Sequence, residues 1–283
     1  MKIIADSGST KTDWLCLLSN GCRLPIVSEG LSPVHQPRET LLRVLGDVRS
    51  KAMAALPDSE QLSEVYFYGS GVAGIYRNVM LGCLADVFPE AIVSAESDML
   101  GAARALFGNE AGVAVILGTG SNSALYDGQR IVGGTPALGY ILGDEGSGAV
   151  LGKQLVGDLY KGSLPVALRS IFEEETGLTM TDIIERVYRQ PLANRFLASL
   201  VPFIHHHKAE WPQLSEMVTN SFRQFLVRNL QPYGPQGRRF AAVGSVAFFF
   251  AAELHQAATA EGLTLAGIER SPITLLAAYH SGR

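Results

Sequence analysis

The turn from Asp6 to Thr12 carries residues that could hold a metal ion and phosphate groups. It follows the apolar run Ile3–Ala5, so the Asp6 carboxylate is expected at the end of a strand. A carboxylate there can hold a hydrated Mg²⁺, and a turn of small residues presents backbone N–H groups to phosphate oxygens. Gly8 allows close approach of a ligand, and hydroxyl donors come from Ser9, Thr10 and Thr12. The alternative is a hairpin stabilised by its own Asp side chain.

A second turn of the same kind spans Leu117–Ser123 and contains Gly118, Thr119 and Gly120. Taken in isolation, it fits an ordinary glycine-rich hairpin equally well. Two such turns in corresponding positions suit a nucleoside triphosphate, because phosphoryl transfer depends mainly on positioning and on stabilisation of charge.

Asp98 is a candidate general base. It lies in the segment Glu96–Asp98, between an expected strand and an expected helix. A carboxylate in this place could accept the proton of an attacking hydroxyl group. The N-terminal end of the helix dipole would lower the pKa of Asp98 and keep it ionised. The alternative role is a helix N-cap, which is common for Asp.

Asp144 and Glu145 lie in the glycine-dense segment Gly139–Gly148, ahead of an expected helix. Helix capping is again the alternative. Carboxylates in such loops also suit hydrogen bonds to vicinal hydroxyl groups of a sugar.

The elements that must position these residues follow the same pattern twice. Strand, turn, strand, turn and strand are expected from about residue 2 and again from about residue 112. Helical and extended segments alternate between the two copies, which predicts an α/β fold with a duplicated domain and a boundary near Gly108–Gly112. Expected strands are Ile3–Ala5, Trp14–Leu18, Arg23–Val27, Val65–Tyr68, Ala91–Val93, Val113–Leu117, Asn122–Tyr126, Arg130–Val132 and Phe240–Val243. Expected helices lie at Leu41–Ala52, Val79–Phe88 and Leu100–Leu106, through most of 151–235, and at Ala247–Ala260.

Composition restricts the class of partner. The 283 residues carry a net charge of −4, which gives no basic footprint for a nucleic acid, and three cysteines, which give no zinc or disulfide framework. Met1–Ala5 runs directly into Asp6 without the apolar core of a signal peptide, and Val246–Ala252 is too short to span a membrane. We expect a soluble cytoplasmic protein with no membrane partner.

The order of these motifs resembles a known family. D-x-G-S-T-K-T begins at Asp6, S-D-x-x-G-A at Ser97, L-G-T-G-S-N at Leu117 and L-G-D-E-G-S-G at Leu142. This series is similar to the N-acetylglucosamine kinase branch of the BadF/BadG/BcrA/BcrD ATPase family. Towards the end of the chain, Val243–Ala247 resembles the adenosine motif of that family, and Ser271–His280 resembles its closing helix.

The resemblance implies two RNase-H-like (actin-like ATPase) lobes with a nucleotide cleft between them. The N-terminal lobe would span residues 1–109 and be joined by the C-terminal helix 271–283, and the C-terminal lobe would span residues 110–270. The implied activity is ATP-dependent phosphorylation of an amino sugar, N-acetylglucosamine to its 6-phosphate, with ATP and Mg²⁺. A homodimer is compatible with the resemblance.

The resemblance also assigns roles to matching positions. Asp98 would be the catalytic base and Asp144 a ligand of sugar hydroxyl groups. Ala137, Leu138 and Gly139 match a stretch that touches the sugar. Mg²⁺ would be held by Asp6 through water, and the adenine would pass near Gly244. The cofactor-binding positions are Asp6, Gly8, Ser9, Thr10, Lys11, Thr12, Gly118, Thr119, Gly120, Gly244 and Ser245.

The sequence departs from the family pattern at two places. After Leu31, members of the family carry an Asn that helps to bind the sugar, whereas this chain has Ser32–His35. Gly244-Ser245 replaces the paired glycines of many relatives. The first departure bears on which sugar is bound, and the second is mild because Ser is small.

Two conspicuous runs are given no chemical role. Consecutive helical residues point about 100° apart, so His205–His207 cannot converge on one metal ion, and we expect an exposed patch. Phe248–Phe250 is expected to pack in the core and not to form a stacking platform.

Three other functions remain as alternatives. A dehydratase-activating ATPase of the same broad family would hold an iron–sulfur cluster through cysteines, but Cys16, Cys22 and Cys83 do not suit such a cluster. A sugar-responsive, non-catalytic regulator of the same fold would need a DNA-binding helix-turn-helix, whereas the first strand is expected from Lys2. A mechanical ATPase of the actin or chaperone type is disfavoured by the compact length.

Overall fold

The computed structural model describes all residues except 9, 56, 58–59 and 283. The described part of the chain divides into two compact units. Unit 1 comprises Met1–Ala111, Asp127–Ile131 and Ser271–Arg283, and unit 2 comprises Gly112–Tyr126 and Val132–Arg270. The chain first passes from unit 1 to unit 2 between Ala111 and Gly112, returns to unit 1 at Asp127–Ile131, and ends in unit 1 from Ser271.

Unit 1 is built on a five-stranded sheet in the order β3-β2-β1-β4-β5. β1 pairs antiparallel with β2 and β2 with β3, whereas β1, β4 and β5 are parallel. The central strand β1 is an almost continuous buried run, because helices cover both of its faces, whereas the edge strand β3 alternates between exposed and partly buried residues. The strands are β1 Lys2–Ser7, β2 Lys11–Leu17, β3 Arg23–Glu29, β4 Glu64–Gly69 and β5 Ile92–Ser97.

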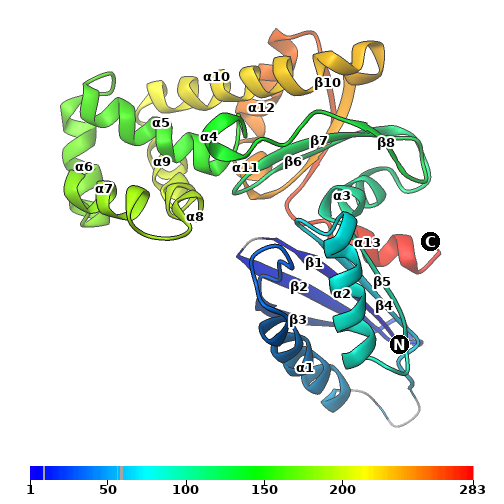
Figure 1. Ribbon diagram of the computed structural model, residues 1–283. Coiled ribbons are helices and arrows are strands. Elements are labelled where there is room, and N and C mark those ends of the chain that lie inside the picture. The colour runs from blue at the N-terminus through cyan, green and yellow to red at the C-terminus, as the bar shows by residue number, and fades with distance from the viewer. Residues whose placement is uncertain (9, 56, 58–59, 283) are drawn as a thin grey trace. The chain divides into compact units, whose positions relative to one another are not determined.

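Two pairs of helices cover this sheet (Figure 1). Side chains such as Trp14 and Phe67 pack on one face with α1 (Arg38–Ala54) and α2 (Gly74–Val87). Ile4 and Tyr68 point to the other face, which is covered by α3 (Asp98–Phe107) and α13 (Ile273–His280). The last helix of the chain thus completes the core around the first strand, and Lys2 Nζ donates a hydrogen bond to the His280 carbonyl at 3.1 Å.

Unit 2 repeats the strand order of unit 1, as β10-β9-β6-β7-β8. β6 and β7 are antiparallel, and β6, β9 and β10 are parallel. The α/β class is therefore confirmed, and the repeated order agrees with the predicted duplication. The strands are β6 Gly112–Leu117, β7 Ser121–Tyr126, β8 Ile131–Gly134, β9 Arg239–Val243 and β10 Thr264–Glu269.

The remainder of unit 2 is mainly helical, as expected for 151–235. One large core joins β6 and β9 to the helices through side chains such as Leu155, Phe172 and Phe222. The single helix expected at Ala247–Ala260 is wrong in detail, because the chain breaks at Phe250. The helices are α4 Gly139–Leu142, α5 Gly148–Lys161, α6 Val166–Thr176, α7 Met180–Tyr188, α8 Ala193–Ala198, α9 Val201–His207, α10 Pro212–Asn229, the 3₁₀ segment η1 Gln231–Arg238, α11 Ser245–Phe249 and α12 Ala251–Ala260.

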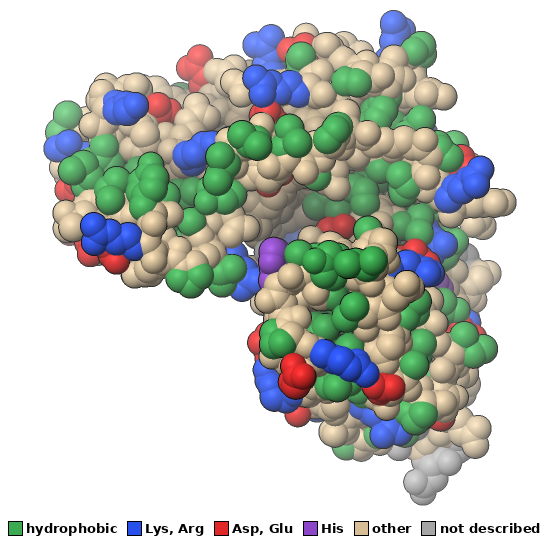
Figure 2. Space-filling view, viewed as in Figure 1, with side chains coloured by type: hydrophobic (Ala, Val, Ile, Leu, Met, Phe, Trp, Pro, Cys, Tyr) green, Lys and Arg blue, Asp and Glu red, His purple; other side chains and the backbone are tan. Residues whose placement is uncertain are grey.

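Some apolar side chains of unit 2 gather on its surface over α6 and α7 (Figure 2). On α7, Ile183 is buried in the core, whereas Met180, Ile184 and Tyr188 follow one another at four-residue spacing on the exposed side. No helix in the described part of the chain has the combined length and hydropathy that crossing a membrane requires.

Candidate active site

Two carboxylates lie at the carboxyl ends of strands in unit 1. Asp6 is the penultimate residue of β1, and Asp98 directly follows β5, with β4 between these two strands. Burial, together with the negative charge of Asp98 and then of Asp13, raises the pKa of Asp6 to about 7. Such a pair of like charges, poorly compensated by cations, is a donor set that a hard divalent cation would stabilise.

Asp98 differs from its expected description in two respects. The N-cap of α3 is Ser97, whose hydroxyl accepts a hydrogen bond from the Leu100 amide at 3.2 Å, so Asp98 is not the cap. Asp98 Oδ1 accepts from the Met99 amide at 2.9 Å. We expected the helix terminus to lower the pKa of Asp98, but burial outweighs these backbone hydrogen bonds and raises it.

The turn after β1 is tied to β3 by buried hydroxyl groups. Ser7 Oγ lies 2.8 Å from Thr12 Oγ1, and Thr12 Oγ1 donates to the Glu29 carbonyl at 3.1 Å. Thr12 is fully buried, so its side chain supports the turn from within the protein. Its predicted contact with a ligand stays a prediction.

The exposed residues of this turn are Gly8, Thr10 and Lys11. The Gly8 amide donates to the Lys11 carbonyl at 3.0 Å, which closes the turn. The Lys11 ammonium forms an ion pair with Asp13 at 2.8 Å. Ser9, also predicted to bind the cofactor, lies outside the described residues.

In unit 2 the turn Gly118–Gly120 is held on two sides by backbone. The Gly148 and Ala149 amides at the start of α5 donate to the Gly118 and Thr119 carbonyls at 2.8 and 3.1 Å. On another side, a Cβ added to Gly244 would lie 2.1 Å from the Leu117 carbonyl oxygen, and Gly244 has φ +124°. Only glycine permits this approach. The segments around Thr119 and Ser245 therefore meet within unit 2.

Asp144 also lies against this turn. Its Oδ2 atom is 3.0 Å from the position of a Cβ added to Gly120. Asp144 adopts φ 55°, an unusual backbone conformation for a residue with a side chain, and one that is enriched at functional sites. Burial raises the pKa of Asp144, the Ser121 backbone lowers it, and neighbouring Glu145 raises it further.

The stretch Ala137–Gly139 is exposed, and it follows a loop anchored by a hydrogen-bond network that the sequence did not suggest. Tyr233 Oη accepts from the Thr135 amide at 3.0 Å and lies 2.9 Å from Ser123 Oγ. Thr135 Oγ1 donates to Asn229 Oδ1 at 3.0 Å. These contacts fix the start of the loop to β7, α10 and η1.

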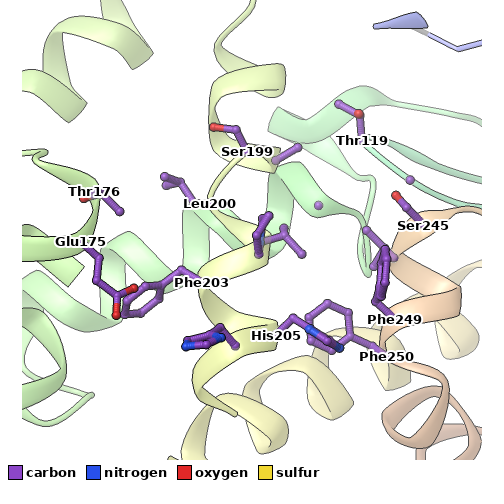
Figure 3. A pocket seen from close by; sticks show the side chains of 17 residues that line it. Thr119, Glu175, Thr176, Ser199, Leu200, Phe203, His205, Ser245, Phe249 and Phe250 are labelled. Atoms are coloured by element: carbon purple, nitrogen blue, oxygen red, sulfur yellow. The ribbon is translucent and has the colours of Figure 1, made fainter. Parts of the chain in front are cut away.

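A pocket of about 810 Å³ lies within unit 2 (Figure 3). Thr119 and Ser245 lie near one end of it. The rings of Phe249, Phe250 and His205 lie further along the wall. Its volume is within the range of small-molecule sites, which are commonly lined by apolar and aromatic side chains with a few polar groups.

The fold and motifs have a close counterpart among solved structures. The chain is 42% identical to a protein from Porphyromonas gingivalis named as a putative N-acetylglucosamine kinase, with a TM-score of 0.94. The comparison covers 100% of this chain and 99% of that one. This chain belongs to the same N-acetylglucosamine kinase-like family.

More distant structures share the fold of this N-acetylglucosamine kinase-like chain. One, named as a putative N-acetylglucosamine kinase from Chromobacterium violaceum, is 18% identical with a TM-score of 0.69, covering 98% of both chains. A ROK-family glucokinase from Streptomyces griseus, solved with glucose and AMPPNP, is 12% identical with a TM-score of 0.56, covering 99% of this chain and 98% of that one. No protein-family model and no curated protein matches the sequence, so the BadF/BadG/BcrA/BcrD branch stays a prediction.

Two runs of the N-acetylglucosamine kinase-like chain that we had given no chemical role contribute to the pocket. The expected exposure is confirmed for His205 and His206 but is wrong for His207, which is buried with Nε2 3.0 Å from Glu175 Oε1. Core packing is confirmed for Phe250 but is wrong for Phe249 and Phe248, which are 41% and 46% exposed. The signal was present in the sequence as three adjacent aromatic residues directly after the Gly244–Ala247 motif.

The three cysteines of this kinase-family chain lie in unit 1. Cys16 and Cys83 are buried in the core and Cys22 is exposed. Burial raises the pKa of the Cys16 thiol to about 11 and also raises that of Cys83. Thiolate ligation, which the dehydratase-activator alternative requires, is therefore disfavoured at both buried positions.

Proposed function

We propose that this chain catalyses the ATP-dependent phosphorylation of an amino sugar, with N-acetylglucosamine as the acceptor and its 6-phosphate as the product. The observation that carries the proposal is the 42% identity, over the whole chain, to the protein named as a putative N-acetylglucosamine kinase. The geometry of each unit supports it, because the motif residues gather at strand ends, where ligands of α/β folds commonly bind.

Asp98 would act as the general base in this reaction. A primary hydroxyl group is a poor nucleophile at neutral pH, so a carboxylate that accepts its proton assists the attack on the γ-phosphorus. The raised pKa of Asp98 brings the carboxyl group closer to the operating pH, where proton transfer is most effective. The bond from the sugar oxygen to the γ-phosphorus forms as the bond between that phosphorus and ADP breaks. The proton of the sugar hydroxyl group passes to Asp98.

The residues of unit 1 fit a magnesium ion. Asp6 would hold it through water, and the hydrated cation would neutralise the mutual repulsion of Asp6 and Asp98 that contributes to the high pKa of Asp6. Mg²⁺ would supply charge neutralisation on the phosphate oxygens. Gly8, Thr10 and Lys11 would bind phosphates from the same turn.

Unit 2 would bind the remaining groups of the two substrates. The turn Gly118–Gly120 would contact the ATP phosphates, and Ser245 would lie beside the nucleoside. Asp144 would accept hydrogen bonds from sugar hydroxyl groups, and the exposed stretch Ala137–Gly139 would contact the sugar ring.

The test is an ADP-release screen with purified protein, Mg-ATP and a panel of hexoses and N-acetylhexosamines, with mass spectrometry of the products. We expect ADP release that depends on the sugar, and N-acetylglucosamine 6-phosphate as the product. ATP hydrolysis that is independent of sugar, without any phosphosugar, would reject the kinase function in favour of an activating or mechanical ATPase.

The same screen tests the choice of sugar. Because Ser32–His35 lacks the Asn of relatives, we expect weaker discrimination between N-acetylglucosamine and glucose than in family members that have this Asn. Loss of one hydrogen bond to the sugar costs on the order of 1 kcal/mol. A preference of many thousandfold for the acetylated sugar would instead show that another residue recognises the acetyl group.

A further inference from the structure

The pocket of unit 2 has chemically different ends. Thr119 and Ser245, at one end, belong to the turns that the proposed function assigns to phosphate and nucleoside, and this inference rests on that function. Further along the wall lie the aromatic rings of His205, Phe249 and Phe250 (Figure 3). A ligand with its phosphates at the first end would therefore place its base among rings.

The three rings form one cluster. The centroid of the His205 ring lies 5.3 Å from that of Phe249 and 5.6 Å from that of Phe250. Phe250 is fully buried and fixes the cluster to the core, whereas Phe249 and His205 are exposed in the wall of the cavity. Exposed aromatic surface in a concave site, rimmed by polar groups, is typical of ligand-binding surfaces.

The wall is also held in place by charged contacts. At the end of α9, Lys208 Nζ donates to both carboxylate oxygens of buried Glu253 at 2.8 and 2.9 Å and lies 5.0 Å from the centre of the Phe250 ring. The Arg270 guanidinium lies 5.2 Å from the centre of the Phe249 ring. The rings are therefore positioned before a ligand arrives, which reduces the entropic cost of binding.

We propose that Phe249 and His205 form the binding wall for the base of the nucleoside triphosphate, and that this wall favours purine over pyrimidine nucleotides. Stacking on an aromatic side chain depends on the area of the base, and a purine presents two fused rings where a pyrimidine presents one. Phe249 is the main contributor, because it adjoins Ser245 at the nucleoside end through the same short helix, α11.

The test measures the dissociation constants of ATP, CTP and inorganic tripolyphosphate by calorimetry for the wild type, Phe249→Ala, Phe249→Tyr and Phe248→Ala. Phe248 is the matched control, since it is adjacent, similarly exposed and not part of the pocket wall. Tripolyphosphate carries the phosphates without a base. Phe249→Ala should weaken ATP binding about 10-fold to 100-fold, the range typical of losing one stacked base.

The expected pattern has three further parts. Tripolyphosphate should bind equally to all four proteins, Phe249→Tyr and Phe248→Ala should bind ATP within about threefold of the wild type, and CTP should bind the wild type more weakly than ATP does. The proposal is overturned if the wild type does not bind ATP, or if Phe248→Ala weakens ATP binding as much as Phe249→Ala does. It is also overturned if Phe249→Ala weakens the binding of tripolyphosphate as much as that of ATP.

The proposed kinase function fails separately. If the wild-type protein shows this base-dependent pattern but forms no phosphosugar, the aromatic wall is supported and the kinase function is rejected. If the protein phosphorylates a sugar but binds CTP as tightly as ATP, the kinase function is supported and the aromatic wall is rejected.

Discussion

Asp98 and its neighbour Ser97 have separate tasks in the structure, and this allows the two tasks to be tested apart. Ser97 caps α3, and Asp98 holds its carboxylate one residue further on. Asp98→Asn should lower kcat by about 10²–10⁴, because an amide cannot accept the proton of the sugar hydroxyl. ATP affinity should hardly change, since the predicted phosphate contacts come from other residues. Steady-state kinetics and ATP calorimetry make the comparison.

Ser97→Ala is the control for this variant. It removes the capping hydroxyl and should lower stability by about 1 kcal/mol while leaving the Asp98 carboxylate in place. The melting temperature should therefore fall in Ser97→Ala, whereas kcat should fall in Asp98→Asn. Near-normal turnover of Asp98→Asn would remove Asp98 from the mechanism.

Asp6 should make the stability of the metal-free protein depend on pH. Its pKa is about 7 when folded, against 3.8 as the ordinary value, so the folded state binds the proton more tightly than the unfolded state does. The favourable contribution of protonated Asp6 is complete below pH 3.8 and is lost as the pH rises to about 7. Asp6→Asn, which stays neutral, should gain stability relative to the wild type over that interval.

Chemical denaturation of both proteins from pH 4 to pH 8 checks this expectation. The advantage of Asp6→Asn should be near zero at the acid end and level off above pH 7. Added Mg²⁺ should reduce the advantage by stabilising the ionised wild-type carboxylate. A difference that does not change with pH would contradict the raised pKa.

At the scale of elements, the contact between α5 and α8 depends on one glycine. A Cβ added to Gly152 would lie 1.9 Å from the Leu197 carbonyl oxygen, which is backbone and cannot rotate away. Gly152→Ala should therefore destabilise the protein by about 1–3 kcal/mol or more, because the two helices must separate. Denaturant unfolding followed by circular dichroism measures the change.

Gly157 on the same helix is the matched control. A Cβ there meets no atom within 4 Å, so Gly157→Ala should stabilise α5 by up to about 1 kcal/mol through helix propensity alone. If both substitutions changed stability in the same direction and by similar amounts, backbone crowding at Gly152 would not be the cause.

Elements with a clear pattern were predictable from the sequence, and elements that depend on neighbours were not. The duplicated strand order could be predicted because each copy begins with apolar runs separated by turn residues. β10 (Thr264–Glu269) was not expected, because its pairing with β9 shifts register between Leu265 and Gly267 and its side chains do not alternate cleanly. The break at Phe250 was missed because neither Gly nor Pro marks it between Ala247 and Ala260.

The candidate site shows the same limit. The carboxylates at Asp6, Asp98 and Asp144 could be named from their turns, since glycine and small residues mark them. The pKa of Asp98 could not be predicted, because burial depends on the packing of α3. Phe249 and Phe250 are adjacent, chemically identical and both line the pocket, yet Phe250 is fully buried in the core whereas Phe249 is 41% exposed. The two residues lie on either side of the end of α11, a boundary that the sequence does not mark.

At the scale of the whole molecule, α13 should be necessary for unit 1 and not for unit 2. His280 stacks on Tyr66 with ring centroids 3.6 Å apart, and its Nε2 atom lies 2.8 Å from Tyr68 Oη. Removing residues 273–283 uncovers the buried face of Ile4 and Tyr68. Amide hydrogen exchange should then rise in β1 and β4 but remain slow in β6 and β9. Equal loss of protection in both sheets would show that the units do not unfold separately.

The return of α13 to β1 has a consequence for how the chain is made. During translation the strands of unit 1 leave the ribosome before unit 2 does, but Leu276 and Ala277, which cover one face of their sheet, leave it after unit 2. All of unit 2 is synthesised in the interval. Synthesis of unit 1 therefore starts before that of unit 2 and is completed after it. Until then, the sheet face with Ile4 and Tyr68 lacks its cover by α13, and it presents apolar surface that a nascent-chain chaperone could bind.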